Sequence, residues 1–151
     1  MKKRNYICGL ECDFARNTDV WLLFLSAGIS LDQYYFEVVD AAVYSQNKRI
    51  EIPKRFNDDY FDDLLQNSCT GERLILQVYH ESEKAEKIDT YHDYTKTQCK
   101  MIVLLYDACY VEIYCKNHEW LTNLWNTATN IPNALVELKY ETTDSRTGMY
   151  V

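Results

Sequence analysis

The segment Met101-Ile-Val-Leu-Leu-Tyr-Asp-Ala-Cys-Tyr-Val-Glu-Ile-Tyr-Cys115 indicates the fold class of this chain. Residues 100–106 form a nearly continuous apolar run, which is typical of a central strand covered on both faces. Asp107 and Ala108 then turn the chain into a second apolar segment, residues 109–115. The two segments together predict a β-hairpin whose first strand lies inside a sheet.

Further strands and helices are predicted on both sides of this hairpin. Strands are expected over residues 5–11, 34–44, 49–52, 73–80 and 134–142, with a short C-terminal strand after a turn at 144–148. Helices are expected over residues 17–27, 58–67, 89–97 and 118–128, and their predicted N-caps include Asn17 or Thr18, Asn57 and Asn117. This order predicts an α+β fold, in which about four helices pack on a mostly antiparallel sheet.

Two parts of the chain resemble each other. Asn57-x-x-Tyr60-Phe61-x-x-Leu64-Leu65 matches Asn117-x-x-Trp120-Leu121-x-x-Leu124-Trp125, and each helix places apolar residues on one face. Each helix also follows a predicted hairpin and precedes a strand. The single expected domain, residues 1–151, is therefore interpreted either as two repeated strand-strand-helix-strand units, roughly 34–80 and 100–142, or as a chance similarity of two amphipathic segments.

The composition excludes several classes of protein. Gly and Pro together are scarce, with 4 and 2 residues in 151, and neither G-x-x-x-x-G-K-[ST] nor G-x-G-x-x-G occurs, so no phosphate-binding glycine loop is expected. The net charge of −7 opposes binding to nucleic acid. No G-x-S-x-G, H-E-x-x-H, EF-hand or C-x-x-C motif is present. No cofactor is expected.

The distribution of apolar residues predicts a protein of the cytoplasm without a membrane segment. The longest apolar run, Val20 to Leu25 with a loose extension through Ile29, is far shorter than the roughly 18 residues that span a bilayer. It also begins too late to be the core of a signal peptide. Because no export signal is visible, the six cysteines are expected to be reduced and mostly buried.

A metal site is not expected. Cys8-x-x-x-Cys12 is the nearest approach to a metal motif, but in a strand four steps separate the two sulfurs by roughly 13 Å, too far for one zinc ion.

Cys115 and His118 are the candidate catalytic residues. The cysteine lies just before the helix that Asn117 caps, where the positive end of the helix lowers a thiol pKa, and the histidine lies in the first helical turn. Against this, no third group that would orient the histidine is identified, and Cys115 shares a strand face with Val111 and Ile113 that is typical of a core.

Two groups of residues are candidates for binding. Tyr110, Glu112 and Tyr114 share the strand face opposite the cysteines, where phenol rings offer contact area and hydroxyls offer direction; packing under a helix is the alternative. The second group is an acidic helix face at Asp58, Asp59, Asp62 and Asp63. One interpretation of this face is a solvated helix surface. The other is a contact for a basic partner, made by Asp59 and Asp63.

The segment 101–128 and the closing Thr143-Asp-Ser-Arg-Thr147 resemble a family of small uncharacterised proteins from spore-forming Gram-positive bacteria, known only as a domain of unknown function. Tyr110-Val-Glu-Ile-Tyr-Cys-Lys116 contributes most of the match, which covers about a third of the chain and contains no catalytic motif. The resemblance implies a cytoplasmic bacterial protein of about this length and supplies no activity.

The expected function is that of a non-enzymatic domain that binds another protein or a small ligand. An immunity-type protein that neutralises a basic toxin would suit the size and the charge of −7. The alternative is a small cysteine-dependent hydrolase or transferase that uses Cys115 and His118. The oligomeric state stays open.

Overall fold

The predicted hairpin lies at the centre of the computed structural model, which describes residues 6–67 and 69–141. Strands β6 (Met101–Tyr106) and β7 (Tyr110–Cys115) pair antiparallel, with Met101 opposite Cys115 and Tyr106 opposite Tyr110. Asp107 and Ala108 in the turn between them adopt positive φ angles of 51° and 66°. The first five residues of β6 are buried, as expected for a strand that is covered on both faces.

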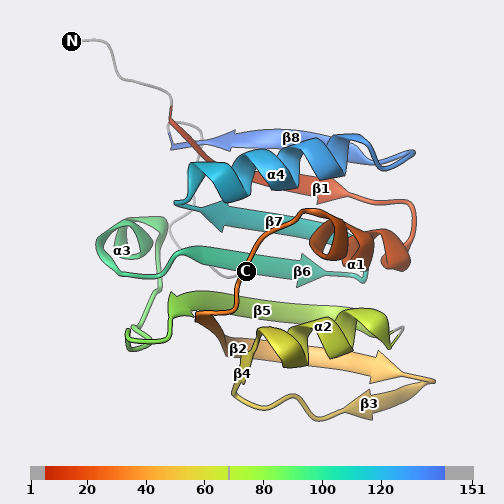
Figure 1. Ribbon diagram of the computed structural model, residues 1–151. Helices are drawn as coiled ribbons and strands as arrows, with labels where there is room; N and C mark the ends of the chain where they lie inside the picture. The colour runs from red at the N-terminus through yellow and green to blue at the C-terminus, as the bar shows by residue number, and fades with distance from the viewer. Residues whose placement is uncertain (1–5, 68, 142–151) are drawn as a thin grey trace.

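The sheet has eight strands, and all of its pairings in the described residues are antiparallel. The other six are β1 (Ile7–Asp13), β2 (Tyr34–Ser45), β3 (Lys48–Ile50), β4 (Arg55–Asn57), β5 (Thr70–His80) and β8 (Leu135–Tyr140). Their order is β3-β2-β5-β6-β7-β1-β8, and β4 also pairs with β2 (Figure 1). The short β4 was not predicted, because three residues after Pro53 show no regular pattern.

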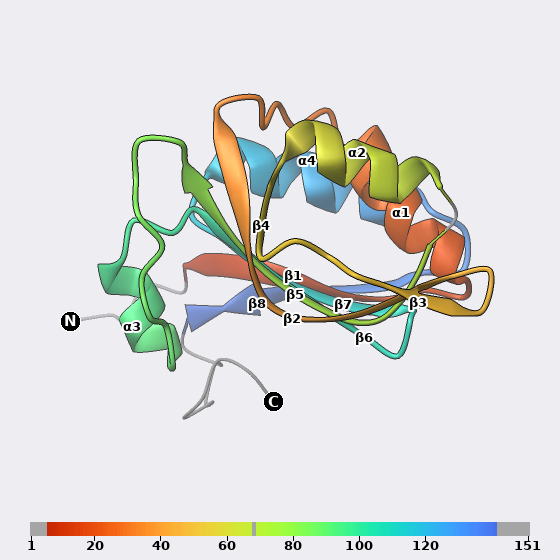
Figure 2. The same cartoon turned by 90° about the horizontal axis from the view of Figure 1, so that it is seen from below.

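The helices lie on both faces of the sheet. Helices α1 (Asn17–Ser26), α2 (Asp58–Gln66) and α4 (His118–Thr129) cover one face, and the short α3 (Tyr91–Lys96) lies at one end of the other face (Figure 2). Each face has its own core: Leu76, Val103 and Ile113 belong to the core under the three helices, and Tyr79 and Tyr114 to the core under α3. The α+β prediction is confirmed.

Two of the predicted helix caps are confirmed and one is wrong. Asn57 and Asn117 accept hydrogen bonds from the backbone N–H groups of Tyr60 and Trp120, at 3.0 and 3.1 Å. Helix α1 instead begins after Arg16, which makes no side-chain cap. Asn17 is the first residue of the helix rather than its cap, and its side-chain amide donates to the carbonyl of Ala108 in the central turn.

The two similar segments share the order strand, strand, helix, strand, but their last strands pair differently. Strand β5 pairs with β2 of its own segment, whereas β8 pairs with β1, which lies between β7 and β8. The internal duplication stays a prediction. The turn at 144–148 and the strand expected after it lie outside the described residues.

A search of the described residues finds no helix that combines the length and the apolar character needed to cross a bilayer.

Candidate functional site

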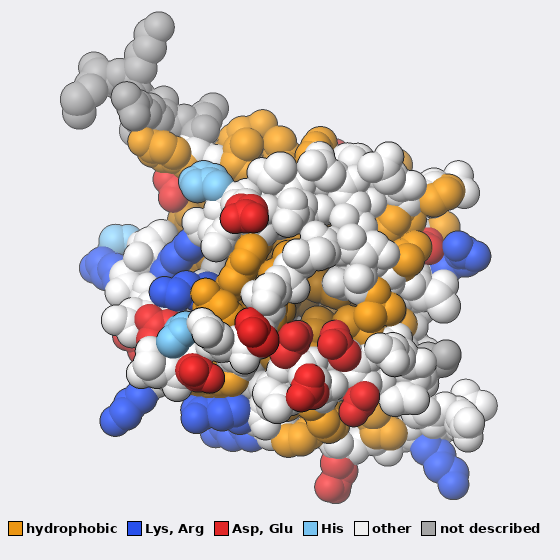
Figure 3. Space-filling view, in the orientation of Figure 1, with side chains coloured by type: hydrophobic (Ala, Val, Ile, Leu, Met, Phe, Trp, Pro, Cys, Tyr) orange, Lys and Arg blue, Asp and Glu red, His pale blue; other side chains and the backbone are white. Residues whose placement is uncertain are grey.

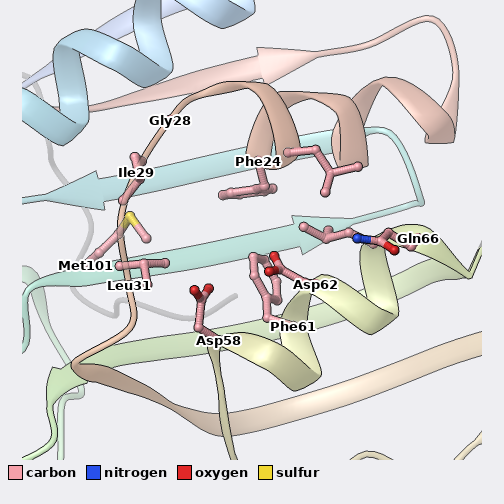
Figure 4. Close-up of a pocket in the computed structure, with 11 residues that line it drawn as sticks. Phe24, Gly28, Ile29, Leu31, Asp58, Phe61, Asp62, Gln66 and Met101 are labelled. Carbon is pink, nitrogen blue, oxygen red and sulfur yellow. The ribbon is translucent and has the colours of Figure 1, made fainter.

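A pocket of about 250 Å³ opens on the helical face, between α1 and α2 (Figure 4). Its lining comes from α1, from the loop that follows α1, from α2 and from the first residue of β6: Phe24, Leu25, Gly28, Ile29, Leu31, Asp58, Phe61, Asp62, Leu65, Gln66 and Met101. Most of these side chains are apolar. Two carboxylates are the charged groups in this lining.

The end of α1 and the aromatic packing beneath it shape the pocket. Gly28, the predicted stop of this helix, has a φ of 68°, a left-handed conformation that lets the chain leave α1. The loop then contributes Ile29 and Leu31 to one wall. Phe24 meets Phe61 of α2 edge to face, with ring centroids 5.5 Å apart. Two packed aromatic rings therefore form part of the pocket wall.

Asp58 and Asp62 lie one helical turn apart on α2, and both are half-buried at the pocket. In Figure 4 the carboxylate of Asp58 points toward Leu31 and Met101, and Asp62 lies beside Phe61. Burial raises the pKa of Asp58 above its ordinary value, and the carboxylates of Asp62, Asp59 and Asp32 raise it further.

Among the described residues, no basic side chain forms an ion pair with these two carboxylates. Within residues 6–67 and 69–141, none of the ion pairs includes Asp58 or Asp62. The pocket therefore combines apolar walls with uncompensated negative charge, an arrangement that favours a ligand with an apolar body and a positive end.

The candidates Asp59 and Asp63 lie on the solvent side of α2 and are exposed. The sequence marks all four aspartates of this helix, but it is Asp58 and Asp62 that line the pocket. A signal for this choice exists in the sequence: Asp58 and Asp62 each precede a buried residue of the same stripe, Phe61 or Leu65, by three positions.

The outer side of α1 adds exposed apolar area next to the pocket. Leu22 and Leu25 are 44% and 46% exposed, although both are large aliphatic side chains. Figure 3 shows hydrophobic side chains beside a row of acidic ones on this face. We call Leu22, Leu25, the pocket and the four aspartates of α2 the α1–α2 surface.

The catalytic candidates Cys115 and His118 line a second pocket of about 360 Å³, near α3. Burial raises the pKa of the Cys115 thiol to about 12, and the Sγ donates to the carbonyl of Asn117 at 3.3 Å. His118 is exposed, and no hydrogen bond joins the two side chains. At neutral pH Cys115 is therefore a protonated thiol without a base beside it, so this geometry does not favour a nucleophile.

The candidate Tyr114 is a core residue. It is fully buried under α3, where its ring contacts those of Tyr91 and Tyr94. Packing under a helix, the alternative for this residue, accounts for its position.

Glu112 and Tyr110 form contacts within the same sheet face. Glu112 is 3% exposed, and its carboxylate pairs with Lys139 Nζ at 3.2 Å. The Tyr110 hydroxyl donates to Glu11 and, at 3.2 Å, to Glu112. The strand pattern brings the two candidates together as predicted. Their polar groups, however, form hydrogen bonds and an ion pair with each other and with neighbouring side chains.

The two cysteines of the Cys8-x-x-x-Cys12 motif lie in different cores. The register between β1 and β8 shifts between Ile7 and Gly9, so Cys8 packs in the core under α3 and Cys12 in the core under the other helices. The described part of the chain contains no group of three or more side chains that could bind a metal ion.

Fold and site together define an α+β protein with an antiparallel sheet and an acid-rimmed apolar pocket among its helices. The chain belongs to the family described as "Protein of unknown function (DUF2691)", whose family model matches residues 7–150. It is also similar to "Uncharacterized protein YncE" of Bacillus subtilis (strain 168), with 22% identity over 116 residues. That alignment covers 77% of this chain and 65% of the relative. No solved structure matches the chain. The resemblance to a family from spore-forming bacteria is confirmed.

Proposed function

We propose that this protein is a non-enzymatic, cytoplasmic domain that binds another protein through the α1–α2 surface. The observation that supports this most directly is the exposure of Leu22 and Leu25 beside the apolar pocket. Apolar area that is concentrated at one place and bordered by charged groups is typical of a protein interaction site.

The charge of this surface favours a partner with a basic patch. Asp58 and Asp62 line the same pocket as the exposed Leu25, and the whole chain has a net charge of −7. Opposite charges on two proteins accelerate their association and select the partner. An immunity-type protein that neutralises a basic toxin is the specific form of this proposal.

The proposed cytoplasmic location agrees with the state of the cysteines. The six cysteines form no disulfide with one another, and five are buried. Free thiols in a chain with this many cysteines suit a reducing compartment.

The test is capture from a lysate of the organism that encodes the chain, at low and moderate salt. The double variant Leu22→Ser/Leu25→Ser removes the exposed apolar contacts, and Leu135→Ser, at a residue that is 70% exposed on β8, is the matched control. We expect a protein that the wild type and the control retain, that the double variant loses, and that binds less at moderate salt because charges are then screened within about 10 Å. Retention by the double variant, or no retained protein at either salt, would contradict the proposal.

Hydrolase or transferase chemistry is the second candidate function, because Cys115 and His118 line one pocket. The high pKa and the buried position of the thiol are the arguments against it. The reactivity of the Cys115 thiol toward iodoacetamide in the folded protein decides between the two functions.

A further inference from the structure

We infer that the pocket between α1 and α2 is the seat of a single arginine side chain, which the protein partner inserts between the aromatic wall and the two half-buried carboxylates. The inference rests on the proposed function and specifies the chemistry of its central contact. It concerns Asp58 and Asp62, rather than the exposed aspartates of the same helix.

The size of the pocket limits its occupant. Its volume of about 250 Å³ is below the roughly 300–1,000 Å³ of pockets that hold drug-sized ligands or cofactors. A long side chain fits this space, and the remainder of the partner then lies over the exposed Leu22 and Leu25. The small volume and the apolar rim therefore favour a side chain of a protein over a free nucleotide or a cofactor.

The lining explains why the side chain is a basic one. Phe24, Phe61 and Leu65 provide an apolar environment for an aliphatic stem, and Asp58 and Asp62 provide negative charge for its end. In the described residues neither carboxylate has an ion-pair partner. A positive group placed beside both also removes their mutual repulsion.

Arginine suits this lining better than lysine. A guanidinium is planar, stacks on aromatic rings and has five N–H donors, so it can donate to two carboxylates at once. It is also more weakly hydrated than an ammonium group, so it loses less hydration free energy when it moves from water to a half-buried site. The half-buried Phe24, which packs edge to face on the buried Phe61, provides the aromatic surface.

The experiment uses three capped tripeptides, Ac-Ala-X-Ala-NH₂, in which X is arginine, lysine or citrulline. Citrulline has nearly the shape of arginine without its charge. Each is added to the ¹⁵N-labelled protein up to about 20 mM, which detects dissociation constants of several millimolar. We expect the arginine peptide to shift the amide resonances of residues 24–31 and of α2, with at least about threefold weaker binding for lysine and about tenfold weaker binding for citrulline.

A pair of variants separates the pocket from the general charge of the helix. Asp58→Asn/Asp62→Asn and Asp59→Asn/Asp63→Asn each remove two negative charges from α2, the first at the pocket and the second at the solvent side. We expect the first variant to weaken binding of the arginine peptide about tenfold and the second to change it less than twofold.

Three results would overturn the inference: no shifts with the arginine peptide, equal binding of arginine and citrulline or of arginine and lysine, and equal losses in the two double variants. These results leave the proposed function intact if capture of a partner still depends on Leu22 and Leu25. Conversely, if capture does not depend on the two leucines, the proposed function fails whatever the peptides do.

Discussion

At Gly9 the absence of a side chain allows β1 to pair closely with β7. It lies in β1, opposite Tyr114 of β7 on one side and Lys139 of β8 on the other. A Cβ atom at this position would overlap the backbone carbonyl of Ile113. The glycine is therefore required by the close approach of two strands, and the register shift at Cys8 lies directly beside it.

Substitution of Gly9 tests this account. We expect Gly9→Ala to lower the free energy of unfolding by more than about 3 kcal/mol, because the backbone of β7 has to move. Gly28→Ala is the comparison: it has open space and a positive φ, so we expect a cost of about 1 kcal/mol. Urea unfolding measures both. Equal costs for the two variants would show that β1 and β7 adjust easily at this point.

The thiols give a second prediction at the level of single residues. With a pKa of about 12, only about one Cys115 in ten thousand is a thiolate at pH 8. Iodoacetamide should therefore modify the half-exposed Cys109 of the folded protein first, and leave the 5% exposed Cys115 unmodified. Mass spectrometry of peptides gives the order. Rapid modification of Cys115 would instead support the cysteine-dependent hydrolase or transferase.

At the level of elements, α2 combines a stable packing face with unfavourable charges. Its buried Phe61, Leu64 and Leu65 fix the helix to the sheet, and Asn57 satisfies its first turn. Asp58 and Asp62 repel each other one turn apart. Removal of this repulsion is therefore expected to make the folded protein more stable.

Removal of one of these charges should increase stability. We expect Asp62→Asn to raise the free energy of unfolding at pH 7 by about 0.2–0.5 kcal/mol, because an i,i+4 like-charge pair disappears. Asp63→Asn removes the equivalent pair with Asp59 at the solvent side of the helix and is the comparison, for which we expect an equal or smaller gain. Urea unfolding of the two variants gives the difference. A loss of stability in Asp62→Asn alone would mean that this carboxylate has a structural role.

The raised pKa of Asp58 also predicts a dependence on pH. Because the folded state holds this proton more tightly than the unfolded state, the folded protein gains stability as pH falls through the pKa of the folded form. Asp58→Asn lacks the proton-binding group. The stability of the wild type relative to this variant should therefore increase as pH falls from 7 to about 4. A constant difference in unfolding free energy over this pH range would show that folding does not shift the pKa of Asp58.

The elements that could be predicted from sequence are those whose signals are local. The apolar run of β6, its turn at Asp107 and the caps Asn57 and Asn117 each depend on a few neighbouring residues, and the structure confirms them. The position of β1 depends on strands a hundred residues away in the chain, and no local pattern encodes it. The pocket needs α1 and α2 side by side, and no local pattern predicts that contact. The sequence marks the acidic helix, and the buried Phe61 and Leu65 are the local sign that Asp58 and Asp62 lie beside its packed face.

For the whole molecule, the sheet separates two cores of unequal size. The larger lies under α1, α2 and α4, and the smaller under α3 and the segment before it. Strand β6 takes part in both, since Val103 faces the first core and Ile102 the second. Disruption of either core is therefore expected to destabilise the strands in the middle of the sheet.

Hydrogen exchange should reflect this arrangement. We expect the amide protons of β5, β6 and β7 to exchange most slowly, through global unfolding, and those of the edge strand β3 to exchange fastest among the strands. Exchange followed by NMR gives the protection of each strand. Strong protection of β3 would indicate that another chain covers this edge.

The position of β1 has a consequence for synthesis on the ribosome. This strand is made first, yet both of its partners are made late: Tyr110 of β7 follows Asp13 by 97 residues, and β8 is later still. At about 5–20 residues per second, β1 waits several seconds before either neighbour exists. Until then Leu10 and Cys12 have no partner strand, and the β1–β8 edge of the sheet forms only after β8 has left the exit tunnel.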